Sequence, residues 1–249
     1  MRLYDKKGRE ISDWRRWSPP KEDYQWRAGR SAMELARAWF TAPQPVLPPE
    51  VRSLLESRAE TRGSELLEGW PEWVTKLPFP GEGRNHDLVA VGSTGARGLL
   101  LAVEGKVDEP FGDLVGSYWR KSKANSKSKA WKRIDTLLAA AFGPQASAAE
   151  KPWRNLRYQL LTALVGTAIE AAARECDIAV LCIHEFVTEA AHPDKLEKNH
   201  EALAAYLEAL GAPSPKAGTL SGPFIVHIPD SEVPIPVLIG TAEYRWAAR

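Results

Sequence analysis

The chain has 249 residues, of which 44% are hydrophobic and 26% are charged, so it can bury a full core and leaves little room for extended disorder. Its 33 lysines and arginines nearly balance its 32 aspartates and glutamates, so any attraction for a polyanion must be local. Its two cysteines argue against a disulfide scaffold, and no apolar run reaches the roughly 20 residues of a membrane span. The charged start lacks the apolar stretch of a signal peptide, so we expect a cytoplasmic protein without a membrane partner.

Two helices are predicted in an N-terminal helical region, residues 1–64. The first covers about 23–40 and is bounded on both sides by prolines, which mark helix boundaries. The second starts after the prolines at 48–49 and keeps apolar residues at roughly helical spacing as far as Leu66 and Leu67. We therefore expect these helices to form a cap on the rest of the chain.

Three strands are predicted next, where the sequence changes to short extended runs. They cover 73–75, 87–91 and 99–104, and the last two are rich in apolar residues. The glycine-rich segment 92–98 separates these two strands and has the length of a hairpin loop. We therefore expect them to pair antiparallel, so that the start of one lies beside the end of the other.

The remainder of the chain alternates between helical and extended patterns. Helices are predicted over about 112–141, with a break in the basic segment 121–129, and over 153–175 and 194–210. The apolar run 178–186 indicates a buried central strand, and two more strands are predicted near 224–228 and 236–244. This order predicts one α/β domain with a central mixed sheet flanked by helices, in which 65–190 form the core and 191–249 add a helix and strands.

Charged residues at two predicted strand ends have the clearest chemical meaning. Glu104 and Lys106 are two positions apart on one strand, so their side chains share a face. Asp87 begins the partner strand, which brings its carboxylate within reach of the same cation as Glu104. Two carboxylates suit Mg²⁺ or Mn²⁺, and a nearby ammonium can orient water or stabilise developing negative charge. The simpler alternative is a surface Glu-Lys pair at a strand end.

The residues around this group resemble a known superfamily. The segments Gly83-Arg84-Asn85-His86-Asp87 and Val103-Glu104-Gly105-Lys106 are similar to the PD-(D/E)xK nucleases, in particular to an uncharacterised bacterial branch, and the resemblance extends over about residues 72–186. It implies a restriction-endonuclease-like fold and a Mg²⁺-dependent nuclease. In that assignment Asp87 and Glu104 hold the metal, and Lys106 positions the attacking water.

The same resemblance implies two further site residues. An upstream acid joins the site in some relatives, and Glu65, Glu68 and Glu72 all compete for that role here. Glu72 is favoured because it is nearest the strands. Gln159, at the start of a predicted helix, would hold water or a phosphate. The alternative is that Gln159 is a solvated residue in the first turn of that helix.

A basic segment predicts contact with nucleic acid. Between Trp119 and Trp131 no acid interrupts the basic residues, and serines and an asparagine add donors for phosphate oxygens. The simpler alternative is that these basic residues form the solvent-exposed face of a helix. The residues expected to contact DNA are Arg120, Lys121, Lys123, Lys127 and Lys129.

Two other functions stay open on the sequence alone. A nuclease-like fold can serve as a nucleic-acid-binding module without cleavage, although the complete Asp-Glu-Lys set favours cleavage. The tryptophan-rich N-terminus could instead be the surface of a protein-interaction module. A homodimer is also left open. We expect a nucleic-acid substrate, with DNA favoured.

Overall fold

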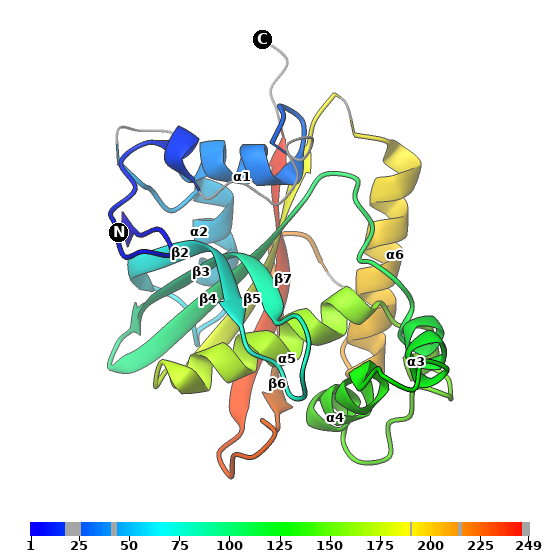
Figure 1. Cartoon of the computed structure of the whole chain (residues 1–249). Helices are drawn as coiled ribbons and strands as arrows, with labels where there is room; N and C mark the ends of the chain where they lie inside the picture. Colours follow the sequence, from blue (N-terminus) through cyan, green and yellow to red (C-terminus); the bar gives the residue numbers. More distant parts are fainter. Residues whose placement is uncertain (18–25, 41–43, 190, 214–215, 246–249) are drawn as a thin grey trace.

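A mixed sheet of seven strands lies at the centre of the protein (Figure 1). The computed structural model describes residues 1–17, 26–40, 44–189, 191–213 and 216–245. In chain order the strands are β1 (Arg2–Leu3), β2 (Glu65–Thr75), β3 (Arg84–Thr94), β4 (Arg97–Lys106), β5 (Ile178–Val187), β6 (Leu220–Val226) and β7 (Ile235–Arg245). Their order across the sheet is β1-β2-β3-β4-β5-β7-β6. The pairs β1–β2, β4–β5 and β5–β7 are parallel, and the others are antiparallel.

Helices cover both faces of this sheet. The helices are α1 (Ser31–Ala38), α2 (Pro49–Glu56), α3 (Val115–Lys123), α4 (Ala130–Phe142), α5 (Tyr158–Ala173) and α6 (Pro193–Ala209), with short 3-10 turns η1 (Trp14–Arg16) and η3 (Trp153–Asn155). One apolar core joins α4, α5 and α6 to one face, and a second joins α1 and α2 to the other. Successive strand residues such as Leu100 and Leu101 belong to different cores. The predicted α/β class, with a mixed sheet flanked by helices, is confirmed.

The β3–β4 hairpin is confirmed and is longer than predicted. Its ladder runs from Leu88–Val103 to Thr94–Arg97, so the loop consists of Gly95 and Ala96. Gly95 has a φ of 60°, which glycine adopts at low cost in a tight turn. Most of the predicted glycine-rich loop therefore belongs to the strands.

The predictions for the N-terminal region are wrong in three places. Residues 23–25 of the predicted 23–40 helix lie outside the described residues, and within the rest only Ser31–Ala38 is helical. The second helix ends at Glu56, and Leu66 and Leu67 lie in β2, one buried and one exposed, because side chains alternate along a strand. The chain also begins with a strand, β1, that pairs with β2.

Three later boundaries also differ from the sequence-based expectation. The predicted 153–175 helix begins at Tyr158, since Arg157 is extended and bridges to Leu114. β2 is longer than the predicted 73–75 strand, and the predicted 224–228 strand is observed at Leu220–Val226. The break between α3 and α4, the central strand β5 and helix α6 lie close to where they were predicted.

Two general features bear on the predicted class of protein. Of the helices that the structure describes, none has the length and apolar character needed to cross a lipid bilayer. Cys176 and Cys182 are buried free thiols.

Candidate active site

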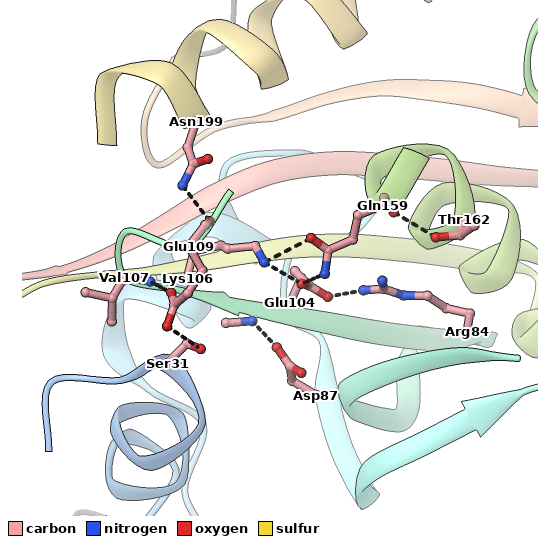
Figure 2. A network of polar contacts seen from close by, with 11 residues as sticks. Ser31, Arg84, Asp87, Glu104, Lys106, Val107, Glu109, Gln159, Thr162 and Asn199 are labelled. Atoms are coloured by element: carbon pink, nitrogen blue, oxygen red, sulfur yellow. Dashed lines mark hydrogen bonds and ion pairs between the residues drawn. The ribbon is translucent and has the colours of Figure 1, made fainter. Parts of the chain in front are cut away.

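The candidate site lies where β3 and β4 separate. Their ladder ends at the pair Leu88–Val103, and Asp87 is the next residue on β3. The Asp87 Oδ2 atom accepts a hydrogen bond of 2.7 Å from the backbone N–H of Gly105. The Asp87 carboxylate is thus fixed beside β4 at the position between Glu104 and Lys106 (Figure 2).

Glu104, Lys106 and Gln159 form a closed set of contacts across β4 and α5. The Lys106 Nζ atom lies 2.9 Å from Glu104 Oε1 and donates to Gln159 Oε1 at 3.1 Å. Gln159 Nε2 in turn donates to Glu104 Oε1 at 2.5 Å. Figure 2 shows the three side chains converging from the strand and the helix. Gln159 therefore holds both charged groups in position rather than pointing into solvent.

Arg84 is a central site residue that the sequence analysis did not assign. Its guanidinium forms an ion pair with Glu104, and the side chain is only 6% exposed. Burial lowers the pKa of Arg84 to about 10, while attraction to Asp87 and Glu72 opposes that shift. Arg84 is thus a second buried cation, beside Lys106, among the site carboxylates. Its place in the segment 83–87, which carries part of the resemblance to the nucleases, was the available signal.

Of the three upstream acids, the structure brings Glu72 to the site. Glu72 is buried and accepts a 2.6 Å hydrogen bond from Asn85 Nδ2. Glu65 is exposed, and Glu68 pairs with Arg2 away from the site. Burial, followed by repulsion from Asp87, raises the pKa of Glu72 to about 7. Burial also raises the pKa of Asp87, against the attraction of Lys106 and Arg84.

Burial has the opposite effect on the ammonium of Lys106. It lowers the pKa of Lys106 to about 8, and attraction to Asp87 opposes the shift. The Nζ atom also lies 5.1 Å from the centre of the Phe111 ring. A lysine with a pKa near neutrality has a neutral fraction that can accept a proton at physiological pH.

These groups line one open cavity of about 1040 Å³, which we call the main cleft. Glu72, Asp87, Glu104, Lys106 and Gln159 all contribute to its wall, and Lys6 and Arg30 lie in the same wall. The five predicted site residues therefore border one space, although they come from four different elements.

The loop after β4 ties two helices to the site. Asp108 Oδ2 accepts a hydrogen bond from Lys195 of α6 at 3.1 Å, and its Oδ1 lies 3.4 Å from Arg30. The backbone carbonyl of Glu109 accepts a hydrogen bond from Asn199, also on α6. These contacts hold the end of β4, and with it Lys106, in a fixed position; Figure 2 shows the hydrogen bond from Asn199 to Glu109.

The predicted DNA-contacting residues divide into two groups. Lys127 and Lys129 line a second cavity of about 800 Å³ that adjoins the main cleft, which we call the side pocket. Arg120, Lys121 and Lys123 are exposed on α3 and line neither cavity. The structure therefore brings two of the five to the site.

The carboxylates fit a hard divalent cation in type and in electrostatics. Among the residues that the structure describes, no three His, Cys, Asp or Glu side chains gather closely enough to form a metal site by themselves. Mg²⁺ commonly takes one or two protein carboxylates and completes its shell with water and phosphate oxygens. Burial is the main cause of the raised pKa values of Glu72 and Asp87, because it disfavours their charged forms. A bound cation would favour the charged forms and so lower these pKa values. Asp87 and Glu104, with Glu72 beside them, are the residues that would hold it.

The raised pKa of Glu72 predicts a pH-dependent loss of stability in the ion-free protein. The folded state holds the Glu72 proton more tightly than the unfolded state. Ionisation of Glu72 therefore lowers the stability of the folded state, and this loss is absent below pH 4.5 and complete above pH 7. We expect the free energy of unfolding to fall by about 3 kcal/mol across that window from this group. Urea unfolding of wild type and Glu72→Gln at several pH values measures it. If the free energy of unfolding of Glu72→Gln falls by the same amount over this pH range, Glu72 is not the group responsible.

Comparison with known proteins gives one match. A sequence model of a protein family described as a domain of unknown function (DUF6946) matches residues 7–243. That range includes the side pocket, the whole lining of the main cleft except Lys6, and nearly the whole sheet. Neither a curated protein nor a solved structure matches the chain.

Proposed function

The chain belongs to the DUF6946 family, and we propose that it is a metal-dependent nuclease of the PD-(D/E)xK kind that hydrolyses phosphodiester bonds in nucleic acid, with DNA favoured. The proposal includes the restriction-endonuclease-like assignment of the fold. It also includes Mg²⁺ or Mn²⁺ as the cofactor.

One observation carries the proposal. A buried lysine with a pKa of about 8 lies 2.9 Å from Glu104 and in the same cleft as Asp87 and Glu72. Burying so many ionisable groups together is costly for stability. Such an arrangement is expected at sites where shifted pKa values serve a reaction.

The chemistry follows from what each group can do. A divalent cation bound by Asp87 and Glu104 would polarise a phosphoryl oxygen and acidify water. Neutral Lys106 can accept a proton from the attacking water, and its ammonium form can stabilise negative charge that develops on the phosphate. Gln159 fixes the Lys106 Nζ atom through its 3.1 Å hydrogen bond. Because Gln159 also donates to Glu104, it keeps the lysine and the carboxylate at a fixed separation.

Lys127 and Lys129 are proposed to contact the phosphate backbone beside the site. We expect Lys127→Ala/Lys129→Ala to weaken DNA binding and to reduce the slope of log affinity against log salt by about 1 per lysine. Fluorescence anisotropy over a salt series measures both quantities.

The matched control removes the same charge from two other positions, Arg120 and Lys121 of α3, which line neither cavity. Arg120→Ala/Lys121→Ala should change the slope less than the Lys127→Ala/Lys129→Ala variant. If both variants reduce the salt slope equally, the net charge of the whole segment attracts DNA, and Lys127 and Lys129 make no particular contact with the phosphate backbone.

Nuclease activity itself is tested by cleavage. Plasmid, linear and single-stranded DNA and RNA would be incubated with Mg²⁺ or Mn²⁺ and with wild type, Asp87→Ala or Lys106→Ala. We expect metal-dependent cleavage in the wild type and its loss in both variants. Lys198→Ala, which removes an exposed lysine of α6, is the control and should cleave normally. Cleavage that persists in Asp87→Ala would refute the assigned site.

A second candidate function is a nuclease-like module that binds nucleic acid without cleaving it. The ion pair between Arg84 and Glu104 favours it, because a buried guanidinium already neutralises one of the two proposed metal ligands. Calorimetric titration with Mn²⁺ separates the two candidates. Mn²⁺ binding that is lost in Asp87→Ala supports the nuclease. DNA binding without any Mn²⁺ binding supports the module.

A further inference from the structure

The side pocket has features that the cleavage chemistry does not use. It shares part of its wall with the main cleft, including Asn85, Asp87, Gln159 and Thr162. The two cavities therefore adjoin at Asp87 and Gln159. A chain that passes Asp87 in the main cleft can place its next unit in the side pocket.

The lining of the side pocket combines aromatic, apolar and cationic groups. Tyr118 and Tyr158 lie in its wall with their ring centres 4.8 Å apart, and Leu77 adds apolar surface. Lys127 and Lys129 bring two exposed ammonium groups to the same space. Its volume of about 800 Å³ is within the range of small-ligand pockets. A flat heterocycle joined to an anion matches this combination.

One wall of the side pocket is fixed by a single arginine. Arg133 of α4 donates to the carbonyl oxygens of Pro78, Phe79 and Glu82 at 2.8–2.9 Å. These three bonds hold the loop between β2 and β3 against α4. Gly81 has a φ of 135°, and a Cβ there would lie 2.8 Å from the Arg133 guanidinium. A side chain at this position would force the guanidinium to shift and would strain the backbone, so glycine suits this close packing.

We infer that the side pocket receives an unpaired nucleotide next to the bond to be cut. Its base lies against Tyr118 and Tyr158, and its phosphate lies near Lys127 and Lys129. This inference rests on the proposed nuclease function and names its substrate class. In a regular duplex both faces of a base are covered by its neighbours, so only an unpaired base can stack on a protein ring. The substrate is therefore single-stranded nucleic acid or a duplex with an unpaired segment.

The test measures binding without a divalent cation, so that cleavage does not interfere. Fluorescence anisotropy would compare a short single-stranded DNA, the blunt duplex of the same sequence and that duplex with single-stranded ends. We expect wild type to bind the single strand and the extended duplex more tightly than the blunt duplex. Tyr118→Leu should weaken single-strand binding roughly 5- to 150-fold and leave blunt-duplex binding within about twofold.

Two controls keep the result interpretable. Tyr118→Phe keeps the ring, so it should bind the single strand like wild type even if Tyr118→Leu is destabilised. Arg120→Ala/Lys121→Ala removes charge from α3 and should not alter the preference for unpaired DNA. Thermal unfolding of each variant identifies loss of folding as a separate cause.

Different results would contradict the side-pocket inference and the proposed nuclease function. If wild type binds all three DNAs equally and Tyr118→Leu changes none of them, the side-pocket inference is wrong and nuclease activity can still stand. If wild type binds neither single-stranded nor duplex DNA and cleaves neither with Mn²⁺, the proposed function fails, and the inference fails with it.

Discussion

Lys106→Met is expected to slow metal-dependent cleavage roughly 10²- to 10⁴-fold, the range that a general acid or base contributes. Methionine fills similar space without the amine, and Arg84 still pairs with Glu104. Substrate affinity should change little, because Lys106 is only 5% exposed. Single-turnover cleavage at saturating Mg²⁺ measures the rate.

The pH profile of the wild type tests the role of Lys106. If the neutral amine accepts the proton, the rate rises with pH until about 8, the pKa of Lys106, and then levels off. Lys106→Met should lose this rise, while the Lys198→Ala control keeps it. A variant that cleaves at the wild-type rate would exclude Lys106 from the reaction.

Arg84→Met is expected to destabilise the ion-free protein by about 3 kcal/mol at neutral pH, the low end of the cost of breaking a buried ion pair, because Lys106 still pairs with Glu104. Glu104 loses its buried guanidinium, and Asp87 and Glu72 lose a nearby positive charge. Protonation of the acids at low pH, or added Mn²⁺, should restore part of the stability. Urea unfolding with and without Mn²⁺ measures each effect.

The double variant Arg84→Met/Glu104→Gln is the matched control. Replacing the carboxylate removes the charge that Arg84 neutralises, so the double variant should be more stable than Arg84→Met alone. Added Mn²⁺ should also stabilise the double variant less than it stabilises Arg84→Met, because one proposed metal ligand has been removed. If Arg84→Met is as stable as wild type, the guanidinium is not the counter-charge of the acidic site.

Local patterns account for much of the predicted fold. The short apolar runs in β3 and β4, the helical spacing in α5 and the apolar run of β5 were sufficient to predict these elements in the correct order. The N-terminal errors occurred where such patterns are ambiguous. Leu66 and Leu67 fit a helix by spacing, yet they lie in β2, where pairing with β3 decides the conformation.

The sequence by itself determined that Glu104 and Lys106 share a face of one strand, because side chains alternate along any strand. It also placed Asp87 near the end of the paired strand. Only the tertiary structure decided that Arg84 pairs with Glu104, that Glu72 rather than Glu68 reaches the cleft, and that α5 places Gln159 beside Lys106. These contacts depend on which helix packs over which strand end. That choice is set by the packing of both cores together, so no local pattern encodes it.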